Sequence, residues 1–287
     1  GRIVRCRLRG RLKQAEATTD LCVIGDRVRV SGEGDASVVV EVLPRHNRFS
    51  RAHPVLKGGR REDVLIANLD VVVVVIAATF PKPHPRLVDR FLVIAEHQGI
   101  EAVIVLTKMD EEGADDALAL FAPHVKVGYR LLPTSIIDGR GLAELDALLQ
   151  RRIATLVGPS GSGKSSLANR IVPGLTEKVG ETSAVHGKGR HTTRVATLHA
   201  TTNGGYLADT PGIRELATFA LPENELDGCF REFVPYLGQC KFRSCRHVTE
   251  PGCAVRDAVD RGEVEPSRYE SYVKLLRGDE RAPRSDG

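Results

Sequence analysis

The pattern of hydrophobic and polar positions divides the chain into three regions. In residues 1–50, short runs with alternating apolar positions, such as "LCVIGDRVRV", are separated by Gly/Asp turns, which predicts the strands of a small β-barrel. The stretch "RHNRFSR" predicts a basic linker. Residues 51–221 alternate unbroken apolar runs with helical patterns, which predicts an α/β domain with a mostly parallel sheet. Residues 222–287 have a helical pattern and four cysteines, and we expect a third, helical unit.

In the middle region the expected strands and helices alternate regularly. Strands are expected at 68–78, 101–110, 125–135, 152–158 and 206–209, and helices at 86–99, 114–124, 141–150 and 164–172. The richest apolar run, "VVVVVIAA", is much shorter than the roughly 18 residues of a membrane span. It fits a strand that is buried on both faces, and we expect no membrane contact.

A phosphate-binding loop is the most specific motif. The segment "GPSGSGKS" matches G-x-x-x-x-G-K-[ST], with an expected strand before it and an expected helix after it. The glycines let backbone N–H groups point at phosphate oxygens, Lys164 reaches the β- and γ-phosphates, and the Ser165 hydroxyl ligates Mg²⁺. The nucleotide-binding residues expected here are Gly158, Pro159, Ser160, Gly161, Ser162, Gly163, Lys164, Ser165 and Ser166.

Two further segments are expected to complete the phosphate and Mg²⁺ site. "YLADTPG" is a strand ending in Asp209, which can hold Mg²⁺ through water, and the Gly212 N–H can sense the γ-phosphate. Between this strand and the phosphate loop lies "GKGRHTT", where Thr193 or Thr192 is expected to complete the Mg²⁺ shell when the γ-phosphate is present.

A guanine-reading loop is predicted upstream of the phosphate loop. In "TKMD" the Asp110 carboxylate can accept hydrogen bonds from the N1–H and 2-amino groups of guanine, which adenine does not offer in that arrangement. Lys108 is expected to lie along the base, and the loop "PTS" to present a backbone N–H at Ser135 to guanine O6. Many GTPases have Asn where this chain has Thr107, which is expected to brace the loop only in part.

The order of these motifs is that of a circular permutation. The base-reading loops precede the phosphate loop, whereas an ordinary GTPase has the phosphate loop first. In a parallel sheet, loops that follow the strands meet at one edge whatever the order in which the chain visits the strands. The permuted order is therefore compatible with one nucleotide site. It also joins the segment after residue 221 directly to the expected nucleotide-sensing segment.

Hydrolysis needs a group other than the water-orienting Gln of many GTPases. The residue after Gly212 is Ile213, which has no hydrogen-bonding side chain, so intrinsic hydrolysis is expected to be slow. His191 is the candidate, because an imidazole with a pKa near neutrality can orient or polarise water. The expected catalytic residues are His191, Lys164 and Thr193.

A structural zinc site is predicted near the C-terminus. Cys240, Cys245, His247 and Cys253 form C-x₄-C-x-H-x₅-C, and four soft ligands in fourteen residues suit a tetrahedral Zn²⁺ with no open position. Such a site folds a segment that is too small for a good core. The other cysteines, Cys6, Cys22 and Cys229, have no partner at ligand spacing and are expected to be core thiols.

The distribution of charge along the chain suggests a polyanionic partner. The net charge of +4 conceals a head of +7 over residues 1–62 and a remainder of −3. An arginine-rich β-barrel is a plausible RNA platform, and since Phe49 is the only aromatic residue of the first 50, we expect phosphate contacts rather than base stacking. The segment 268–278 is expected to be a basic amphipathic helix that offers a further contact surface.

The motifs and their order resemble those of the circularly permuted small ribosomal subunit biogenesis GTPases, the RsgA or YjeQ family. The matching stretches are "RCRLRG", "GDRV", "TKMD", "GPSGSGKSSL", "GRHTT", "DTPG" and the Cys/His cluster. The resemblance implies an N-terminal OB-fold (1–50), a circularly permuted P-loop GTPase domain (51–221) and a zinc-binding domain (222–287). It also implies GTP hydrolysis that is stimulated by the small ribosomal subunit, whose rRNA and proteins are the partners.

Other interpretations remain open at this stage. One is an RNA-binding module in which GTP is only a switch, and another is a permuted GTPase of large-subunit assembly. An ATP-driven motor is disfavoured by Asp110 and by the lack of helicase motifs. We expect a monomer that uses GTP, Mg²⁺ and one Zn²⁺. No secretory signal is visible, which suggests a bacterial cytoplasmic protein, and an organelle is not excluded because the chain starts at Gly1.

Overall fold

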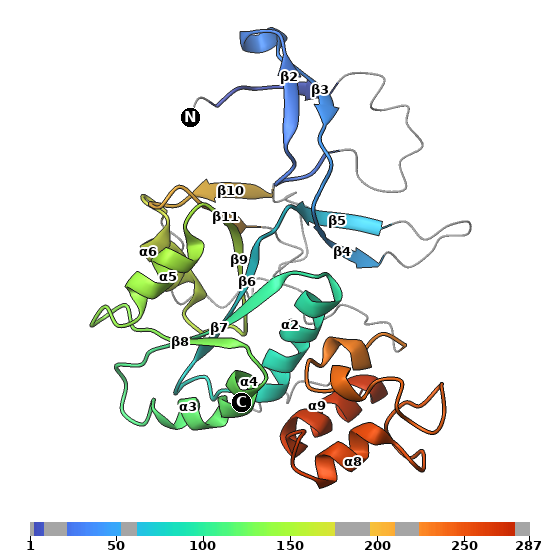
Figure 1. The fold of residues 1–287 in the computed structure, drawn as a ribbon. Coiled ribbons are helices and arrows are strands. Elements are labelled where there is room, and N and C mark those ends of the chain that lie inside the picture. The colour runs from blue at the N-terminus through green and yellow to red at the C-terminus, as the bar shows by residue number, and fades with distance from the viewer. Residues whose placement is uncertain (1–2, 9–21, 53–61, 176–195, 210–223, 279–287) are drawn as a thin grey trace, which may run out of the picture.

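A computed structural model describes residues 3–8, 22–52, 62–175, 196–209 and 224–278, and Figure 1 shows their arrangement. The centre of the molecule is a six-stranded sheet covered by helices. Its strands are β6 (Val71–Ala77), β7 (Glu101–Thr107), β8 (Arg130–Pro133), β9 (Ile153–Val157), β10 (Thr197–Ala200) and β11 (Tyr206–Asp209). The helices of this domain are α2 (Pro85–His97), α3 (Asp116–Leu120), α4 (Ala122–Lys126), α5 (Leu142–Leu149) and α6 (Lys164–Ile171).

The sheet has the order β10-β11-β9-β6-β7-β8, and every neighbouring pair is parallel except β10 with β11. This confirms the predicted mostly parallel sheet. Strand β6 lies at its centre, and alternate valines of this strand enter two separate cores, one on each face. Helix α2 covers one face, and α5 and α6 cover the other. Burial of both faces explains why β6 is a continuous apolar run.

The predicted helix at 114–124 is two short helices, α3 and α4, that meet at Phe121. Phe121 is fully buried in the core, and Pro123 lies in the first turn of α4. A proline fits there because the first N–H groups of a helix have no partner within it. None of the helices in the described ranges has the length and apolar character needed to cross a membrane.

The N-terminal region contains a three-stranded sheet, order β1-β3-β2, formed by β1 (Arg7–Leu8), β2 (Val28–Ser31) and β3 (Val38–Val42). The predicted basic linker is wrong: residues 48–52 are strand β4 (Arg48–Ala52), paired with β5 (Glu62–Ala67). Phe49 and Ile66 of this pair are fully buried in the core of the central six-stranded sheet. The charges of this stretch suggested a linker, whereas its one aromatic residue, Phe49, is buried and holds the strand against the core.

A tight turn at Gly25, in the N-terminal region, packs against the end of β5. Gly25 has φ +84°, and a Cβ at this position would lie 1.9 Å from the carbonyl oxygen of Ala67, so no other residue fits. The side-chain amide of Asn68 donates to the Gly25 carbonyl at 2.9 Å. Asp26 next to it accepts two hydrogen bonds from the Arg45 guanidinium, at 2.7 and 2.8 Å. The "GDRV" motif therefore anchors the head to the sheet.

The C-terminal unit packs against α2, at the opposite end of the molecule from the head (Figure 1). It consists of two 3₁₀ turns, η3 (Asp227–Cys229) and η4 (Val234–Tyr236), and two helices, α8 (Ala254–Asp260) and α9 (Pro266–Arg277). Phe230, Phe233 and Tyr272 form its aromatic centre, and Val93 of α2 belongs to the same core. The unit thus completes its small core with a face of α2.

A buried network of charged groups also links the C-terminal unit to α2 and α4. Arg268 of α9 pairs with Asp89 of α2 and with Glu232, whose carboxylate accepts at 2.6 Å, and His124 of α4 contacts Asp89 at 2.7 Å. Burial alone would raise the pKa of Asp89, but its hydrogen bond with His124 and the charge of Arg268 outweigh burial and leave the pKa below its usual value. Asp89 is therefore ionised.

The predicted basic amphipathic helix at 268–278 is present, with one of its arginines on the buried face. The helix exists as α9, but Arg268 is 1% exposed and serves as an internal ion-pair partner, and Tyr272 lies in the aromatic core. The sequence pattern identified the helix correctly. It could not show that an arginine on this helix faces two acids of other elements instead of solvent.

Candidate functional site

The predicted nucleotide-binding loops meet at one edge of the sheet. Strands β7, β8, β9 and β11 run parallel, so the segments after Thr107, Pro133, Val157 and Asp209 all leave at their carboxyl ends. This edge is where open α/β sheets bind ligands. The position of a loop at this edge does not depend on the order of the strands along the chain. The permuted motifs therefore lie at a single site.

The phosphate loop has a backbone that only glycine permits at two positions. Gly158 has φ +143°, and a Cβ there would lie 2.1 Å from the Val75 carbonyl oxygen of β6. Gly163, the residue before α6, has φ +86°. The loop therefore curls tightly between the end of β9 and the start of α6, with the helix N-terminus facing the sheet edge. A nucleotide phosphate group fits such a cradle of backbone N–H groups.

The Lys164 ammonium group lies over this loop. Its Nζ donates to the Pro159 carbonyl at 2.6 Å, so the side chain folds back across the loop that it follows. Ser165 and Ser166 are half-buried in the first turn of α6. The charged group of the loop is thus held where phosphate oxygens would be bound.

Thr107 braces the guanine-reading loop against the phosphate loop. Its hydroxyl donates to the Ser162 carbonyl at 2.7 Å, and both residues are buried. A Cβ at Gly163 would lie 3.1 Å from the same hydroxyl oxygen. The bond links the end of β7 to the phosphate loop directly, which is the function expected of an Asn at this position.

Replacing Thr107 by Val is expected to weaken guanine nucleotide binding about 3- to 10-fold. The valine keeps the size of the side chain but leaves the buried Ser162 carbonyl without its donor, and a lost neutral hydrogen bond costs about 0.5–1.5 kcal/mol. Fluorescent GDP titration measures the change. Thr107→Ser keeps the hydroxyl and is the control, and equal affinities of the Val and Ser variants would contradict the brace.

Lys108 contacts the loop that follows β6, because its Nζ donates to the Phe80 carbonyl. The backbone of Lys108 has a left-handed φ of +61°. In the same loop, the Thr79 hydroxyl donates to the Glu111 carboxylate. A Cβ at Gly161 of the phosphate loop would lie 3.4 Å from Pro81. Residues 79–81 therefore lie beside both the guanine-reading loop and the phosphate loop, a placement that the sequence did not indicate. Asp110 is exposed at the same edge.

The predicted second guanine loop, around Ser135, is held by hydrogen bonds of its own. The Ser135 N–H donates to the Arg140 carbonyl at 3.0 Å, and its hydroxyl accepts from the N–H groups of Ile137 and Asp138 at 3.0 and 3.3 Å. The Arg140 guanidinium also donates to the Met109 carbonyl at 3.3 Å, which ties this loop to the guanine-reading loop. Ser135 is thus the organiser of the loop, and its own N–H is already used.

Several predicted residues lie outside the described residues. They are His191, Thr192, Thr193 and Gly212, so the catalytic and switch predictions rest on the sequence. Asp209 is described, at the end of β11 next to β9. The structure therefore brings together the predicted guanine loops, the phosphate loop and Asp209, the acid expected near Mg²⁺.

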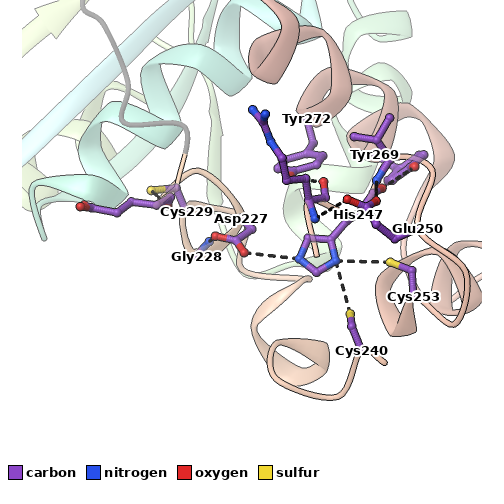
Figure 2. A network of polar contacts seen from close by, with 12 residues as sticks. Asp227, Gly228, Cys229, Cys240, His247, Glu250, Cys253, Tyr269 and Tyr272 are labelled. Atoms are coloured by element: carbon purple, nitrogen blue, oxygen red, sulfur yellow. Dashed lines mark hydrogen bonds and ion pairs between the residues drawn. The ribbon is translucent and has the colours of Figure 1, made fainter. Parts of the chain in front are cut away.

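The cysteine and histidine cluster is the second site, and Figure 2 shows its contacts. The ligand atoms of Cys240, Cys245, His247 and Cys253 all lie within 4.8 Å of one another. His247 Nδ1 lies 3.5 Å from the Cys240 sulfur and 3.3 Å from the Cys253 sulfur. Three sulfurs and one imidazole nitrogen at this spacing fit a tetrahedral Zn²⁺ site.

A carboxylate orients the histidine of this cluster. Asp227 of η3 contacts His247 Nε2 at 3.3 Å, on the side of the ring away from the sulfurs (Figure 2). This contact favours a proton on Nε2 and leaves Nδ1 free to bind a metal. The sequence pattern of the cluster does not point to Asp227, because this residue lies thirteen positions before the first cysteine of the cluster.

The backbone between the ligands is held by Glu250 and two tyrosines. The Glu250 carboxylate accepts from the N–H groups of Arg246, Val248 and Thr249 at 2.9, 3.0 and 3.0 Å, and these bonds, that of Arg246 foremost, lower its pKa to about 2. The hydroxyls of Tyr272 and Tyr269 donate to the carbonyls of Arg246 and His247 at 2.8 and 2.7 Å. The backbone on both sides of His247 is therefore fixed from two directions.

Burial affects the acidity of two cysteines of the cluster. It raises the pKa of the Cys245 thiol to about 12, and it also raises the pKa of the Cys253 thiol. A metal binds the thiolate, so a bound cation has to displace a proton there.

The remaining cysteines agree with the prediction only in one case. Cys229 is buried in the core of the C-terminal unit, as expected for a core thiol, and burial raises its pKa to about 12. Cys22 is exposed and Cys6 is half-buried, so the prediction is wrong for both. Their strands and turns belong to a small sheet that has little interior.

Two guanine loops, a phosphate loop and a permuted strand order define a circularly permuted P-loop GTPase. The family model described as "RsgA GTPase" matches residues 42–219, and the chain belongs to this family. "Small ribosomal subunit biogenesis GTPase RsgA" of Gemmatimonas aurantiaca is 45% identical over 272 residues, covering 93% of this chain and 88% of that protein. The protein with this name in Azotobacter vinelandii is 41% identical, covering 96% and 78%.

Solved structures show the same similarity. YjeQ from Thermotoga maritima superposes with a TM-score of 0.78 at 34% identity, covering 97% of this chain and 90% of that one. YloQ, a circularly permuted GTPase, gives a TM-score of 0.74 at 32% identity, covering 99% and 88%. The chain is therefore a GTP hydrolase, and the predicted family resemblance is confirmed.

Proposed function

We propose that this GTPase binds the small ribosomal subunit and hydrolyses GTP during the late maturation of that subunit. The observation that carries the proposal is the junction of the guanine loops and the phosphate loop through the Thr107–Ser162 bond, in a chain of this family. The names of the relatives, which place them in small-subunit biogenesis, supply the partner. A ribosomal partner also agrees with the positive charge of the head.

In this proposal each segment of the sheet edge has one task. Asp110 accepts from guanine N1–H and the 2-amino group, and the loop of Ser135 supplies the donor for O6. Since the Ser135 N–H is used within the loop, the neighbouring N–H of Ile136, which has no hydrogen-bond partner among the described residues, takes that task. Residues 158–166 hold the phosphates, with Lys164 on the β- and γ-phosphates.

Ser165, in the first turn of α6, Asp209, at the end of β11, and Thr193 would hold Mg²⁺. The ion would neutralise charge on the phosphates during transfer. His191 orients or polarises the attacking water, since Ile213 has no polar side chain. The Gly212 N–H senses the γ-phosphate.

The organisation of the chain completes the proposal. Residues 1–50 form an OB-fold that contacts rRNA. Residues 51–221 form the GTPase domain, and residues 222–287 form a domain with one structural Zn²⁺. Strand β4 crosses the first of these boundaries. The two β-sheets of the N-terminal region and its arginines are compatible with an OB-fold. The protein acts as a monomer in the cytoplasm, where small subunits mature.

The decisive experiment measures GTP hydrolysis by the protein alone, with small subunits and with large subunits. Stimulation by small subunits only is the expected result. Stimulation by large subunits instead would favour assembly of the other subunit. GTP-dependent subunit binding with no change in single-turnover cleavage would mean that GTP is only a switch.

His191→Ala is expected to keep GTP affinity within about twofold and to lose most of the stimulated turnover. The imidazole acts on water and makes no ground-state contact with the nucleotide in this proposal, and general acid–base groups contribute about 10²–10⁴-fold. Titration with a non-hydrolysable GTP analogue measures the affinity, and single-turnover cleavage with small subunits measures the stimulated turnover. Wild-type stimulated rates in this variant would remove His191 from the mechanism.

A further inference from the structure

Phe80 places an exposed aromatic ring at the nucleotide edge of the sheet. It lies three residues after the end of β6 and is 77% exposed. Two other aromatic residues of the described ranges are exposed, Tyr206 and Phe242. Tyr206 lies at the start of β11, at the opposite edge of the sheet, and Phe242 lies in the C-terminal unit. A single exposed ring is common on protein surfaces, so the position of Phe80 carries the argument.

The backbone at Phe80 is tied to the guanine-reading loop. Its carbonyl accepts a hydrogen bond from the Lys108 ammonium group. The hydroxyl of the preceding residue, Thr79, donates to the Glu111 carboxylate in the same guanine-reading loop. These two bonds fix the point from which the Phe80 side chain leaves the backbone. A ligand that contacts the ring therefore has little backbone entropy to overcome.

The loop of Phe80 lies where the sugar of a bound nucleotide is expected. A Cβ at Gly161 of the phosphate loop would lie 3.4 Å from Pro81, so this loop also contacts the phosphate loop. The Thr107–Ser162 bond of 2.7 Å shows that the guanine-reading loop and the phosphate loop are in direct contact. In a guanine nucleotide the ribose joins the base to the phosphates. With the base on the first loop and the phosphates in the second, the ribose lies beside residues 79–81.

The chemistry of the ring suits a sugar. The face of an aromatic ring carries partial negative charge and attracts C–H groups, which a ribose offers along with its hydroxyls. The Thr79 hydroxyl is engaged with Glu111, and the Lys108 side chain, which is expected to lie along the base, is held by the Phe80 carbonyl. The ring of Phe80 is thus the apolar surface of this loop that is left for the ribose.

We propose that Phe80 binds the nucleotide directly, with its ring packed on the ribose. The proposal rests on the nucleotide site of the proposed function, in which Asp110 reads the base and residues 158–166 hold the phosphates. It assigns a contact to the one part of the nucleotide for which that site names no residue. The ribose is the same in GTP and GDP, so the ring contributes equally to the binding of both. A uniform contribution of this kind changes KM and leaves kcat unchanged.

A comparison of two ligands tests the contact between ring and sugar. The first ligand is GDP, and the second is acyclovir diphosphate, which keeps guanine and both phosphates but has an open ether chain in place of the ribose ring. Each is titrated calorimetrically into the wild type and into Phe80→Ala, because a fluorescent label on the ribose would disturb the contact. Phe242→Ala is the matched control, since it removes an exposed phenylalanine from the C-terminal unit.

Phe80→Ala is expected to bind GDP about 10-fold more weakly than the wild type and to bind the acyclic ligand within about twofold of it. A tenfold loss corresponds to about 1.4 kcal/mol, which about 55 Å² of buried apolar surface supplies. Phe242→Ala should change neither affinity. The acyclic ligand also reports on the integrity of the site, because a distorted site would lose both ligands.

Two results of these titrations would overturn the proposal. One is unchanged GDP affinity in Phe80→Ala, and the other is an equal loss for both ligands, since the ring would then act on the base, on the phosphates or on the shape of the site. Unchanged GDP affinity together with weaker stimulation by small subunits would make Phe80 a subunit contact instead of a ribose contact.

A fluorescent reporter gives an independent measurement. The chain contains no tryptophan, so Phe80→Trp introduces a single indole. GDP should lower the quenching of this indole by acrylamide about twofold or more, and the acyclic ligand should lower it less. The indole of Phe242→Trp should respond to neither ligand. Equal quenching of Phe80→Trp with and without GDP would contradict the contact.

The same proteins separate this proposal from the proposed function. A wild type that binds GDP but is not stimulated by small subunits would refute the proposed partner, and the titrations would still decide the role of Phe80. A wild type that binds no guanine nucleotide would refute the nucleotide site and this proposal together. With stimulation intact, Phe80→Ala should raise the KM for GTP about 10-fold and keep kcat within about twofold. A fall in kcat with an unchanged KM would contradict the ribose contact alone.

Discussion

Removal of the metal is expected to unfold residues 224–278 and to leave the central sheet folded. The C-terminal unit is short, and a core of this size rarely supplies more than about 3–5 kcal/mol. A structural Zn²⁺ bound by four ligands contributes about 10–16 kcal/mol. Since the metal term exceeds the core term, the unit depends on the metal, whereas the two cores around β6 contain none of its ligands.

Hydrogen exchange with and without a chelator measures this outcome. Amides of α8 and α9 should lose protection, while those of β6 and β7 keep it. Cys253→Ser should have the effect of the chelator, and Asp227→Asn should weaken metal binding about 10- to 100-fold without abolishing it, because Asp227 only orients His247. Full protection of α9 in metal-free protein would contradict the assignment.

Arg268→Ala is expected to destabilise the chain by about 3–5 kcal/mol. The substitution removes the shared partner of two buried acids, Asp89 and Glu232, and leaves their charges uncompensated. The lost stability should weaken the packing of the C-terminal unit against α2, because Asp89 lies on that helix. Arg277→Ala, at the exposed end of the same helix, should change stability by less than about 0.5 kcal/mol.

A triple variant separates two free-energy costs of Arg268→Ala, that of leaving buried charges unpaired and that of removing side-chain volume. Arg268→Met with Glu232→Met and Asp89→Asn removes all three of these charges and keeps an acceptor for His124. Replacement of buried ion pairs by apolar groups is often neutral, so most of the stability should return. Urea unfolding measures all variants. A loss below about 1 kcal/mol for Arg268→Ala would show that the network contributes little.

The strands and the glycine-rich loop at the edge of the sheet were predictable from the sequence because they depend on local patterns. Apolar runs identified β6, β7 and β9, and the glycines of the phosphate loop demand their own backbone geometry. The edge at which the loops meet then follows from the parallel order of the strands. What remained unpredicted was the contact of Lys108 with Phe80 and the use of the Ser135 N–H within its own loop, since both depend on partners from other segments.

The C-terminal unit and the head were less predictable for the same reason. Charge suggested that 45–51 and 268–278 are exposed, but Phe49 and Arg268 are buried by contacts with elements far away in the chain. The Cys/His cluster was predicted from spacing alone, because metal chelation restricts that spacing. Asp227 was not, because a residue that orients a ligand can come from any position that folding brings near.

The central claim is that Asp110 reads guanine in the pocket framed by the phosphate loop. The measurement that tests it is competition of GTP, ATP and XTP for the nucleotide site of the wild type and of Asp110→Asn. Xanthine has a carbonyl where guanine has its 2-amino group, so an Asn side-chain amide can donate where the Asp carboxylate accepted. We predict that the wild type prefers GTP and that Asp110→Asn loses about 100-fold or more in GTP affinity and gains XTP binding. Unchanged GTP preference in Asp110→Asn would contradict the account.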